Sequence, residues 1–247
     1  MTANKALLTL LLYAVSFVAL AQDDSKKSGD DGEVAQQQAM QHVRDLIDAS
    51  KAAEAIPVLD RMLDYYAGKF PEGNTRWYVA RTPEETLAYM VQAAAAYDRG
   101  TATGDKAVSL YVLWSEAHYM KGYALVELGR MAAAKPSLER AIHLSPYNAR
   151  FLAELGNLYQ WERNWEKAYE LYLSAEDLAA FSPPQDEVKD RGRAKRGLAF
   201  VLVEQGKFEE ARKKLEECLE LDPKDQRARN ELDYIRSLEA AKSDSSV

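Results

Sequence analysis

The sequence is short of the residue types that most enzyme sites need. Its 247 residues include a single cysteine, Cys218, and three histidines, His42, His118 and His143. One cysteine cannot form a disulfide within the chain, and metal sites need clustered ligands that isolated histidines do not supply. Serine-hydrolase, zinc-protease and glycine-rich phosphate motifs do not occur in it. We therefore predict no catalytic residue, no metal ligand and no cofactor, and a protein that is not an enzyme.

Positive charge is also scarce, because the net charge is -7. Binding to nucleic acid needs a clustered basic surface, so we do not expect a nucleic-acid partner. One basic cluster does occur, KDRGRAKR at residues 189–196, but Asp186, Glu187 and Asp190 dilute it. We interpret it as a solvated helix face, with contact to an anionic partner as the alternative.

Long hydrophobic runs are confined to the N-terminus. Lys5 precedes an apolar stretch, Ala6 to Leu20, which is too short to span a bilayer comfortably, and Ala19-Leu20-Ala21 fits a cleavage signal. We predict a signal peptide at residues 1–21, a periplasmic or secreted protein, and no stable membrane insertion after cleavage. An uncleaved anchor is the alternative. Residues 22–33 are highly charged and lack large apolar residues, which predicts a disordered acidic tether.

What the sequence does have is a repeat of small and large residues. Gly122 and Gly156 are 34 residues apart, and so are Ala134 and Ala168. A third copy has Ala199 in the place of these glycines, after nine extra residues that include a helix-start signal at Ser182-Pro183. Glycine inside a helix costs ~1 kcal/mol relative to alanine, so its recurrence requires a gain from packing.

A 34-residue helix–turn–helix period with this order of small and large residues resembles the tetratricopeptide repeat. The resemblance covers residues 115–148, 149–182 and 192–225. It departs from the family pattern at Arg163, which replaces the usual turn glycine, and at Ala180, which replaces the terminal proline. The resemblance implies an all-α solenoid of the tetratricopeptide type, a right-handed superhelix. Small residues would lie where two helices cross closely, so that large neighbours interlock.

We expect the helical repeat domain to span residues 34–241. Residues 35–69 follow the same offsets and predict a divergent repeat, and residues 70–81 predict a non-helical crossing. Thr82 with Glu85 forms a capping box for a helix that reaches about Arg99. Asp105 is expected to cap a helix through Leu128, so residues 82–128 predict a helical pair. Whether the second helix is continuous stays open. Residues 226–241 predict a polar-backed capping helix and residues 242–247 a disordered tail.

The resemblance also implies a concave groove lined by the first helix of each repeat. The predicted protein-binding residues are Tyr119, Tyr123, Arg150, Asn157, Trp161, Arg193, Arg196 and Phe200. Aromatic residues with arginines are typical of a recognition surface. The alternative is a groove filled by neighbouring helices. A carboxylate-clamp version of the family is disfavoured, because Tyr119, Tyr123, Glu154 and Gly197 occupy four of its positions.

These features predict a non-enzymatic adaptor or scaffold of the bacterial cell envelope that binds peptide segments of a partner protein in its groove. Two other classes stay open. One is an enzyme or an accessory subunit that uses the repeats as a substrate platform. The other is a structural module that associates with itself. The sequence names neither the partner nor the oligomeric state.

Overall fold

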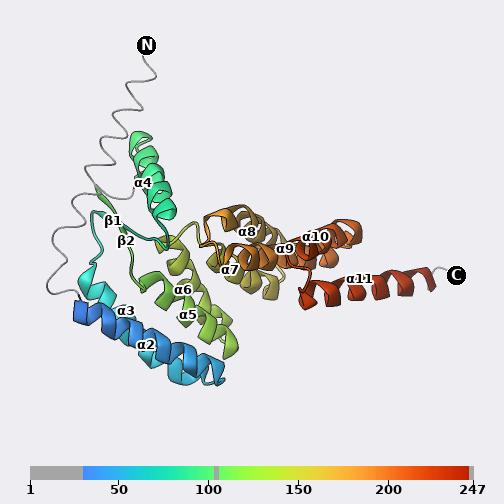
Figure 1. The fold of residues 1–247 in the computed structure, drawn as a ribbon, viewed down its shortest axis with the longest axis horizontal. Coiled ribbons are helices and arrows are strands. Elements are labelled where there is room, and N and C mark those ends of the chain that lie inside the picture. The colour runs from blue at the N-terminus through green and yellow to red at the C-terminus, as the bar shows by residue number, and fades with distance from the viewer. Residues whose placement is uncertain (1–29, 103–105, 245–247) are drawn as a thin grey trace, which may run out of the picture.

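The protein is an array of antiparallel helix pairs (Figure 1). The computed structural model describes residues 30–102 and 106–244. Each helix packs against the other helix of its pair, and successive pairs pack on one another. This architecture confirms the predicted helical solenoid. The pairs are α2 (Asp30–Asp48) with α3 (Ala52–Lys69), α5 (Trp114–Glu127) with α6 (Met131–Leu144), α7 (Ala149–Trp161) with α8 (Trp165–Leu178), and α9 (Glu187–Glu204) with α10 (Phe208–Leu221). The short turn η1 (Ala179–Phe181) follows α8, and α11 (Gln226–Asp244) closes the array.

The turn inside each pair uses one residue in the left-handed region of the backbone. Gly129 and Gly206 have φ of 69° and 75°, as glycine allows without strain. Arg163 and Ser50 occupy the equivalent places with φ of 56° and 58°. The replacement of the turn glycine by Arg163 therefore keeps the turn and accepts its strain.

Glycines lie where the two helices of a pair approach most closely. A Cβ added to Gly122 would lie 2.6 Å from the side chain of Leu138, and one added to Gly156 would lie 2.9 Å from the ring of Tyr172. Leu138 and Tyr172 are both fully buried. The space that each glycine leaves is thus filled by a large side chain of the second helix, which explains the cost accepted in the helix interior.

The divergent first pair has the core that its sequence predicts. Val43 and Leu46 on α2 and Leu59 and Met62 on α3 are buried together. Helix α2 begins at Asp30, so residues 30–33 form its first turn and are not part of a disordered tether. Glu33 accepts hydrogen bonds from Tyr66 and Lys69, which fix this turn to α3.

A strand–helix–strand insertion separates the first pair from the second. Strand β1 (Thr75–Val79) lies in the predicted crossing, α4 (Pro83–Asp98) follows, and β2 (Lys106–Leu110) pairs with β1 in parallel. The prediction of a helix from Asp105 to Leu128 is wrong, because residues 106–110 form a strand and α5 begins only at Trp114. Asp105 itself lies outside the described residues.

Both faces of the small sheet are covered, which explains why its sequence shows no alternation of polar and apolar residues. Val79 packs with Tyr66 and Trp114 on the side of the array. On the other face, Tyr78 stacks on Tyr89 of α4 with ring centroids 5.1 Å apart. The insertion therefore has a core of its own.

Three boundaries differ from the sequence-based expectations. Thr82 caps α4 as predicted, but the Glu85 side chain accepts the N–H of Arg81 at 2.6 Å instead of closing the box on Thr82. The chain after Ser182-Pro183 makes a turn, and α9 begins at Glu187. Helix α11 runs through Asp244, so the first residues of the predicted tail are helical.

The predicted signal peptide, residues 1–21, lies outside the described residues. Among the helices of residues 30–102 and 106–244, none combines the length and the apolar character that crossing a bilayer requires.

Candidate functional site

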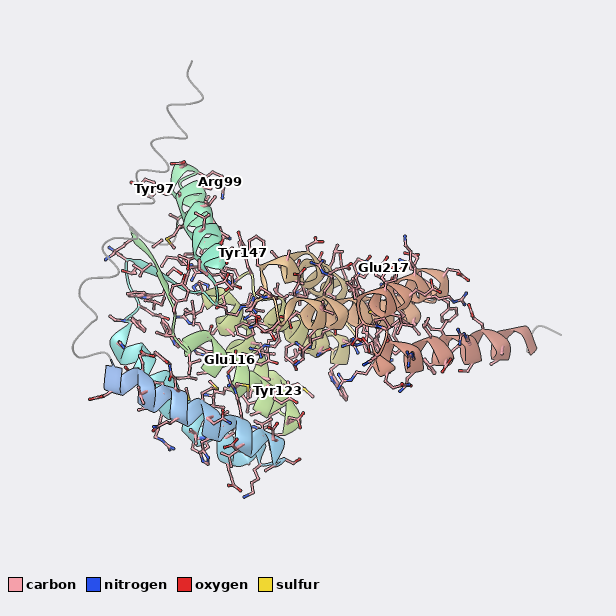
Figure 2. All side chains as sticks on the ribbon, viewed as in Figure 1. Tyr97, Arg99, Glu116, Tyr123, Tyr147 and Glu217 are labelled. Carbon is pink, nitrogen blue, oxygen red and sulfur yellow. The ribbon has the colours of Figure 1, made fainter. Side chains whose placement is uncertain are left out.

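A charged groove of about 500 Å3 lies where α2, α5, α7 and α9 come together. Four of the eight predicted binding residues line it: Tyr119, Tyr123, Arg150 and Arg193. They come from three successive helix pairs, as the common offsets in the repeat predict. Glu116 and Tyr123, on α5, are labelled in Figure 2.

Aromatic rings form the apolar part of the groove. Tyr119 is only 6% exposed and stacks on Phe151 of α7 with ring centroids 4.8 Å apart. Tyr123 lies one turn further along α5, with its ring centroid 6.4 Å from that of Tyr119. The guanidinium of Arg150 lies 4.6 Å from the centroid of Tyr119, a cation–π contact. Burial raises the pKa of the Tyr119 hydroxyl, so this ring stays neutral.

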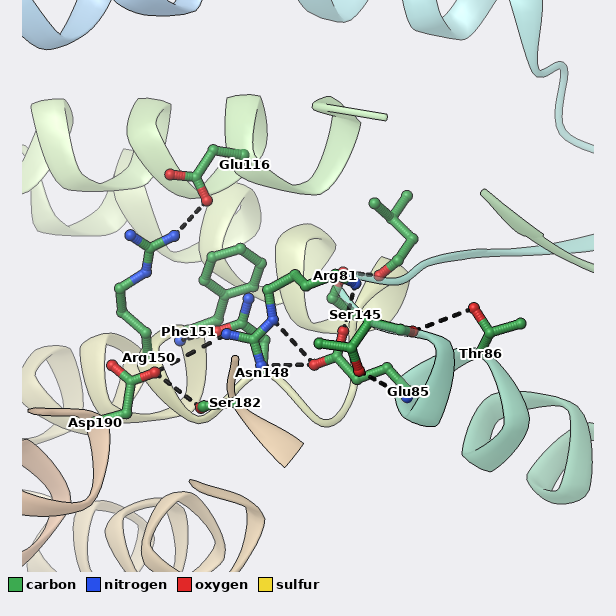
Figure 3. A network of polar contacts seen from close by, with 12 residues as sticks. Arg81, Glu85, Thr86, Glu116, Ser145, Asn148, Arg150, Phe151, Ser182 and Asp190 are labelled. Carbon is green, nitrogen blue, oxygen red and sulfur yellow. Dashed lines mark hydrogen bonds and ion pairs between the residues drawn. The ribbon is translucent and has the colours of Figure 1, made fainter. Parts of the chain in front are cut away.

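Acidic residues hold the arginines of the groove in place. Arg150 donates a hydrogen bond to Glu116 of α5 (Figure 3). Asp190 of α9 is buried, and it accepts hydrogen bonds from Ser182 at 2.9 Å and from Arg193 at 3.3 Å. These contacts orient the guanidinium groups before any partner arrives, which reduces the entropy cost of binding.

The insertion contributes one arginine to the same network. Arg81 precedes α4, and its Nε donates to Glu85 at 2.9 Å. Its guanidinium also lies 3.9 Å from the carboxylate of Asp190 (Figure 3). Glu85 is completely buried, so the Arg81–Glu85 pair is a fixed element of the structure. Sequence reasoning missed Arg81 as a groove residue, because its contact with α9 is distant in sequence.

The rim of the groove carries charges with fewer partners. Arg44 of α2 and Lys189 of α9 are exposed and line the groove. Within residues 30–102 and 106–244, neither side chain lies in an ion pair. Asp48 and Asp186 add negative charge to the same rim. The rim can therefore exchange ion pairs with a charged partner at little structural cost.

The other four predicted residues do not line this groove. Asn157 accepts a hydrogen bond from Tyr172 at 2.6 Å, and Trp161 is 70% exposed. Arg196 bonds to Asp225, just before α11. Phe200 lies beside Trp165, with ring centroids 6.3 Å apart. The equal offsets in the repeat place these residues on first helices, but the array carries them away from α2 and the insertion.

The basic cluster of residues 189–196 is divided between the groove and the packing of the array. Lys189 and Arg193 line the groove, whereas Lys195 is only 7% exposed and bonds to Glu176 and Glu217. The interpretation as a solvated helix face is therefore wrong for Lys195. Ion pairs with α8 and α10 use its charge to join three helices.

The buried titratable groups outside the groove have environments that favour their neutral forms. Burial, with Arg140 and Lys121 nearby, lowers the pKa of His118 to about 3. Burial lowers the pKa of His143 to about 4. The pKa of Cys218 is raised to about 12 by burial, so its thiol is not an activated nucleophile at neutral pH. Among the described residues, no three His, Cys, Asp or Glu side chains gather as metal ligands do.

The fold and its groove define the chain as a helix-pair repeat scaffold. Models of the tetratricopeptide repeat match residues 115–148 and residues 192–225. The chain is therefore a tetratricopeptide-repeat protein, and such repeats form protein-binding scaffolds. None of the curated protein sequences compared with the chain matches it.

Solved structures resemble the chain at low identity. One is the first tetratricopeptide repeat domain of Spaghetti (RPAP3) bound to an HSP90 peptide, with 22% identity and a TM-score of 0.44 over 51% of this chain and 95% of that chain. Another is PilF of Pseudomonas aeruginosa, with 19% identity and a TM-score of 0.44 over 64% of this chain and 70% of that chain.

Proposed function

We propose that the chain is a non-enzymatic adaptor that binds an extended segment of a partner protein in the groove between α2, α5, α7 and α9. One observation carries this proposal. Three successive helix pairs bring Tyr119, Tyr123, Arg150 and Arg193 to a single groove of about 500 Å3. A continuous surface built from several repeats is the arrangement by which repeat proteins hold long, irregular segments.

The groove supplies two kinds of contact to such a segment. The partly buried ring of Tyr123 offers apolar area to a partner side chain at low entropy cost. Arg150 and Arg193 present guanidinium groups that Glu116 and Asp190 already hold. Arg44 and Lys189 at the rim would meet acidic side chains of the partner, and exposed charges of this kind act chiefly on the rate of association.

We further propose that the adaptor works in the bacterial cell envelope. The support is the N-terminal sequence alone: Lys5, the apolar stretch to Leu20 and the small residues around Ala21 have the order of an export signal. N-terminal sequencing of protein recovered from a Gram-negative host should begin at Gln22. A membrane-bound product that retains Met1 would contradict this part of the proposal.

Site-specific photo-cross-linking tests the groove in the cell. A photoreactive phenylalanine analogue at Tyr123 should yield one dominant cross-linked product that the same analogue at Leu173 does not yield. Leu173 is the matched control, because it is an exposed residue on α8 outside the groove. Identical products from both positions, or none from Tyr123, would contradict the assignment of the groove.

Affinity measurements with the cross-linked partner then test the contacts. Tyr123→Ala should weaken binding by ~2 kcal/mol or more if the ring is a central anchor. Lys189→Ala should instead lower the association rate at low salt and have little effect at high salt, where charges further apart than about 3 Å are screened. Tyr234→Ala, an exposed tyrosine on α11, is the control that should bind like the wild-type protein.

A further inference from the structure

The parallel sheet of the insertion has one open edge, along β2. Lys106 donates its N–H to Asn74, and the carbonyl of Leu110 accepts from Ala80. In a parallel ladder, alternate residues direct their backbone groups to the same neighbour. Lys106, Val108 and Leu110 therefore face β1. The N–H and C=O groups of Ala107 and Ser109 point away from it.

The opposite edge of the sheet, along β1, already has partners. The carbonyl of Val79 accepts a hydrogen bond from the Ser145 hydroxyl at 2.6 Å, and that of Trp77 accepts from Arg76 at 3.0 Å. By contrast, no side chain or backbone group of residues 30–102 and 106–244 bonds to the outward groups of Ala107 or Ser109. Every residue of β2 is at least partly exposed, whereas β1 ends on buried residues. A free strand edge of this kind is a template for another strand.

Exposed apolar side chains lie above the same edge, on α4. The face of α4 that meets the sheet carries Tyr89, and one flank, with Ala88 and Gln92, borders the hollow beside Tyr147. Helical spacing puts Leu87 and Val91 on the opposite flank, away from Tyr147 and over the β2 side. Leu87 is 60% exposed and Val91 is 54% exposed. Helix α4 stands clear of the helix pairs in Figure 1, so this flank is accessible.

We propose that this edge joins two copies of the chain, with β2 of one copy antiparallel to β2 of the other. The sheets would then merge into one of four strands, with a twofold axis perpendicular to it. Neighbouring strands lie about 4.8 Å apart, so a helix placed over the β1–β2 pair lies about 5 Å from that axis. The two α4 helices would be about 10 Å apart, which is the distance at which helices pack.

The sequence of β2 suits pairing with itself. Full overlap of the strand centres the pair on Val108, whose backbone groups face β1, so Val108 meets its copy in a non-hydrogen-bonded pair. Ala107 then exchanges hydrogen bonds with Ser109 of the second copy. Lys106 lies opposite Leu110, so no like charges meet. Leu87 and Val91 pack against the same residues of the second α4. One patch thus provides hydrogen bonds, small side chains and apolar contact to itself, which is what an isologous interface needs.

The oligomeric state of the purified protein in a concentration series tests the proposal, for example by sedimentation velocity. The wild-type protein should dimerise as its concentration rises. Ser109→Pro removes only the outward N–H of β2 and should raise the dissociation constant of the dimer at least tenfold. Ser109→Ala is the matched control, because it loses the hydroxyl but keeps the N–H, and it should dimerise like the wild-type protein.

A second pair of variants tests the helix contact without touching the strand. Leu87→Lys would place like charges between the two α4 helices and should also raise the dissociation constant at least tenfold. Leu173→Lys on α8 adds the same charge elsewhere and should have no effect. A wild-type protein that stays monomeric at every concentration would overturn the proposal. So would a dimer that tolerates both Ser109→Pro and Leu87→Lys. The groove between α2 and α9 is a separate surface, so the adaptor proposal is independent of this outcome.

Discussion

At the scale of single residues, the four turns of the helix pairs allow a direct comparison of glycine with other residues. All four adopt left-handed backbone angles, but only Gly129 and Gly206 are glycines. A residue with a Cβ pays roughly 1–2 kcal/mol in this region because Cβ approaches the backbone oxygen. Arg163 makes no ion pair among the described residues that would offset this strain. The sequence pattern that singles out Arg163 thus identifies a strained position.

Replacing Arg163 with glycine should relieve this strain. Because glycine also has more freedom in the unfolded chain, we expect the free energy of unfolding to rise by only up to ~1 kcal/mol. Chemical denaturation measures the change, and Gly206→Ala is the reciprocal control, expected to lower the free energy of unfolding by about the same amount. If Arg163→Gly destabilises the protein, the arginine side chain makes a contact that outweighs the strain.

At the scale of helices, Tyr172 of α8 is the residue around which two pairs are assembled. An added Cβ would lie 2.9 Å from its ring at Gly156 of α7 and 2.3 Å from it at Gly197 of α9. The hydroxyl of Tyr172 reaches the side-chain oxygens of Asn157 and Gln160 on α7. Neighbouring repeats are therefore locked together by one ring that needs a glycine on either side.

This arrangement predicts opposite effects for two glycine substitutions in helices. Gly197→Ala should lower the free energy of unfolding by ~1–3 kcal/mol, because the added methyl group overlaps a fully buried ring. Gly68→Ala in α3 meets no atom within 4 Å and should raise it by ~0.5–1 kcal/mol through helix propensity. Equal denaturation midpoints for the two variants would show that the ring of Tyr172 moves aside freely.

The repeat was predictable from sequence because small residues at a fixed period reflect local packing. Gly122 and Gly156 revealed the helix crossings, and their offsets led to Tyr119 and Tyr123 in the groove. The strands were not predictable, because residues 106–110 are too few, and covered on both faces, to show a period of two. The groove contacts of Arg81 and Arg44 were also missed, because no repeat relates these residues to Asp190 or Tyr119.

At the scale of the whole molecule, α11 seals the end of the array through a small polar cluster. Arg196 of α9 bonds to Asp225, and the same carboxylate accepts the N–H of Ala228 in the first turn of α11. Glu231 lies beside them on α11. Burial, reinforced by the charge of Asp225, raises its pKa from 4.5 to about 7, although Arg196 opposes this shift. The docking of α11 therefore depends on whether Glu231 carries a proton.

The sign of this dependence follows from the raised pKa. The folded state binds the proton more tightly than the unfolded chain, so the contribution of Glu231 is fully present below pH 4.5 and is lost as the pH rises through about 7. Glu231→Gln removes the charge at every pH. Relative to the wild-type protein, the variant should gain thermal stability between pH 5 and pH 8. Parallel melting-temperature curves for the two proteins over this range would contradict the prediction.

The contact between Arg81 and Asp190 has a mechanical consequence. Helix solenoids bend easily along their length, because each repeat touches only its neighbours. Here the insertion leaves the array after the first pair and returns to it at α9, past the two pairs between (Figure 3). It acts as a strut across the concave side and resists both opening and closing of the curve. The jaws of this clamp are therefore set at a fixed gauge, and their span selects the thickness of what they hold.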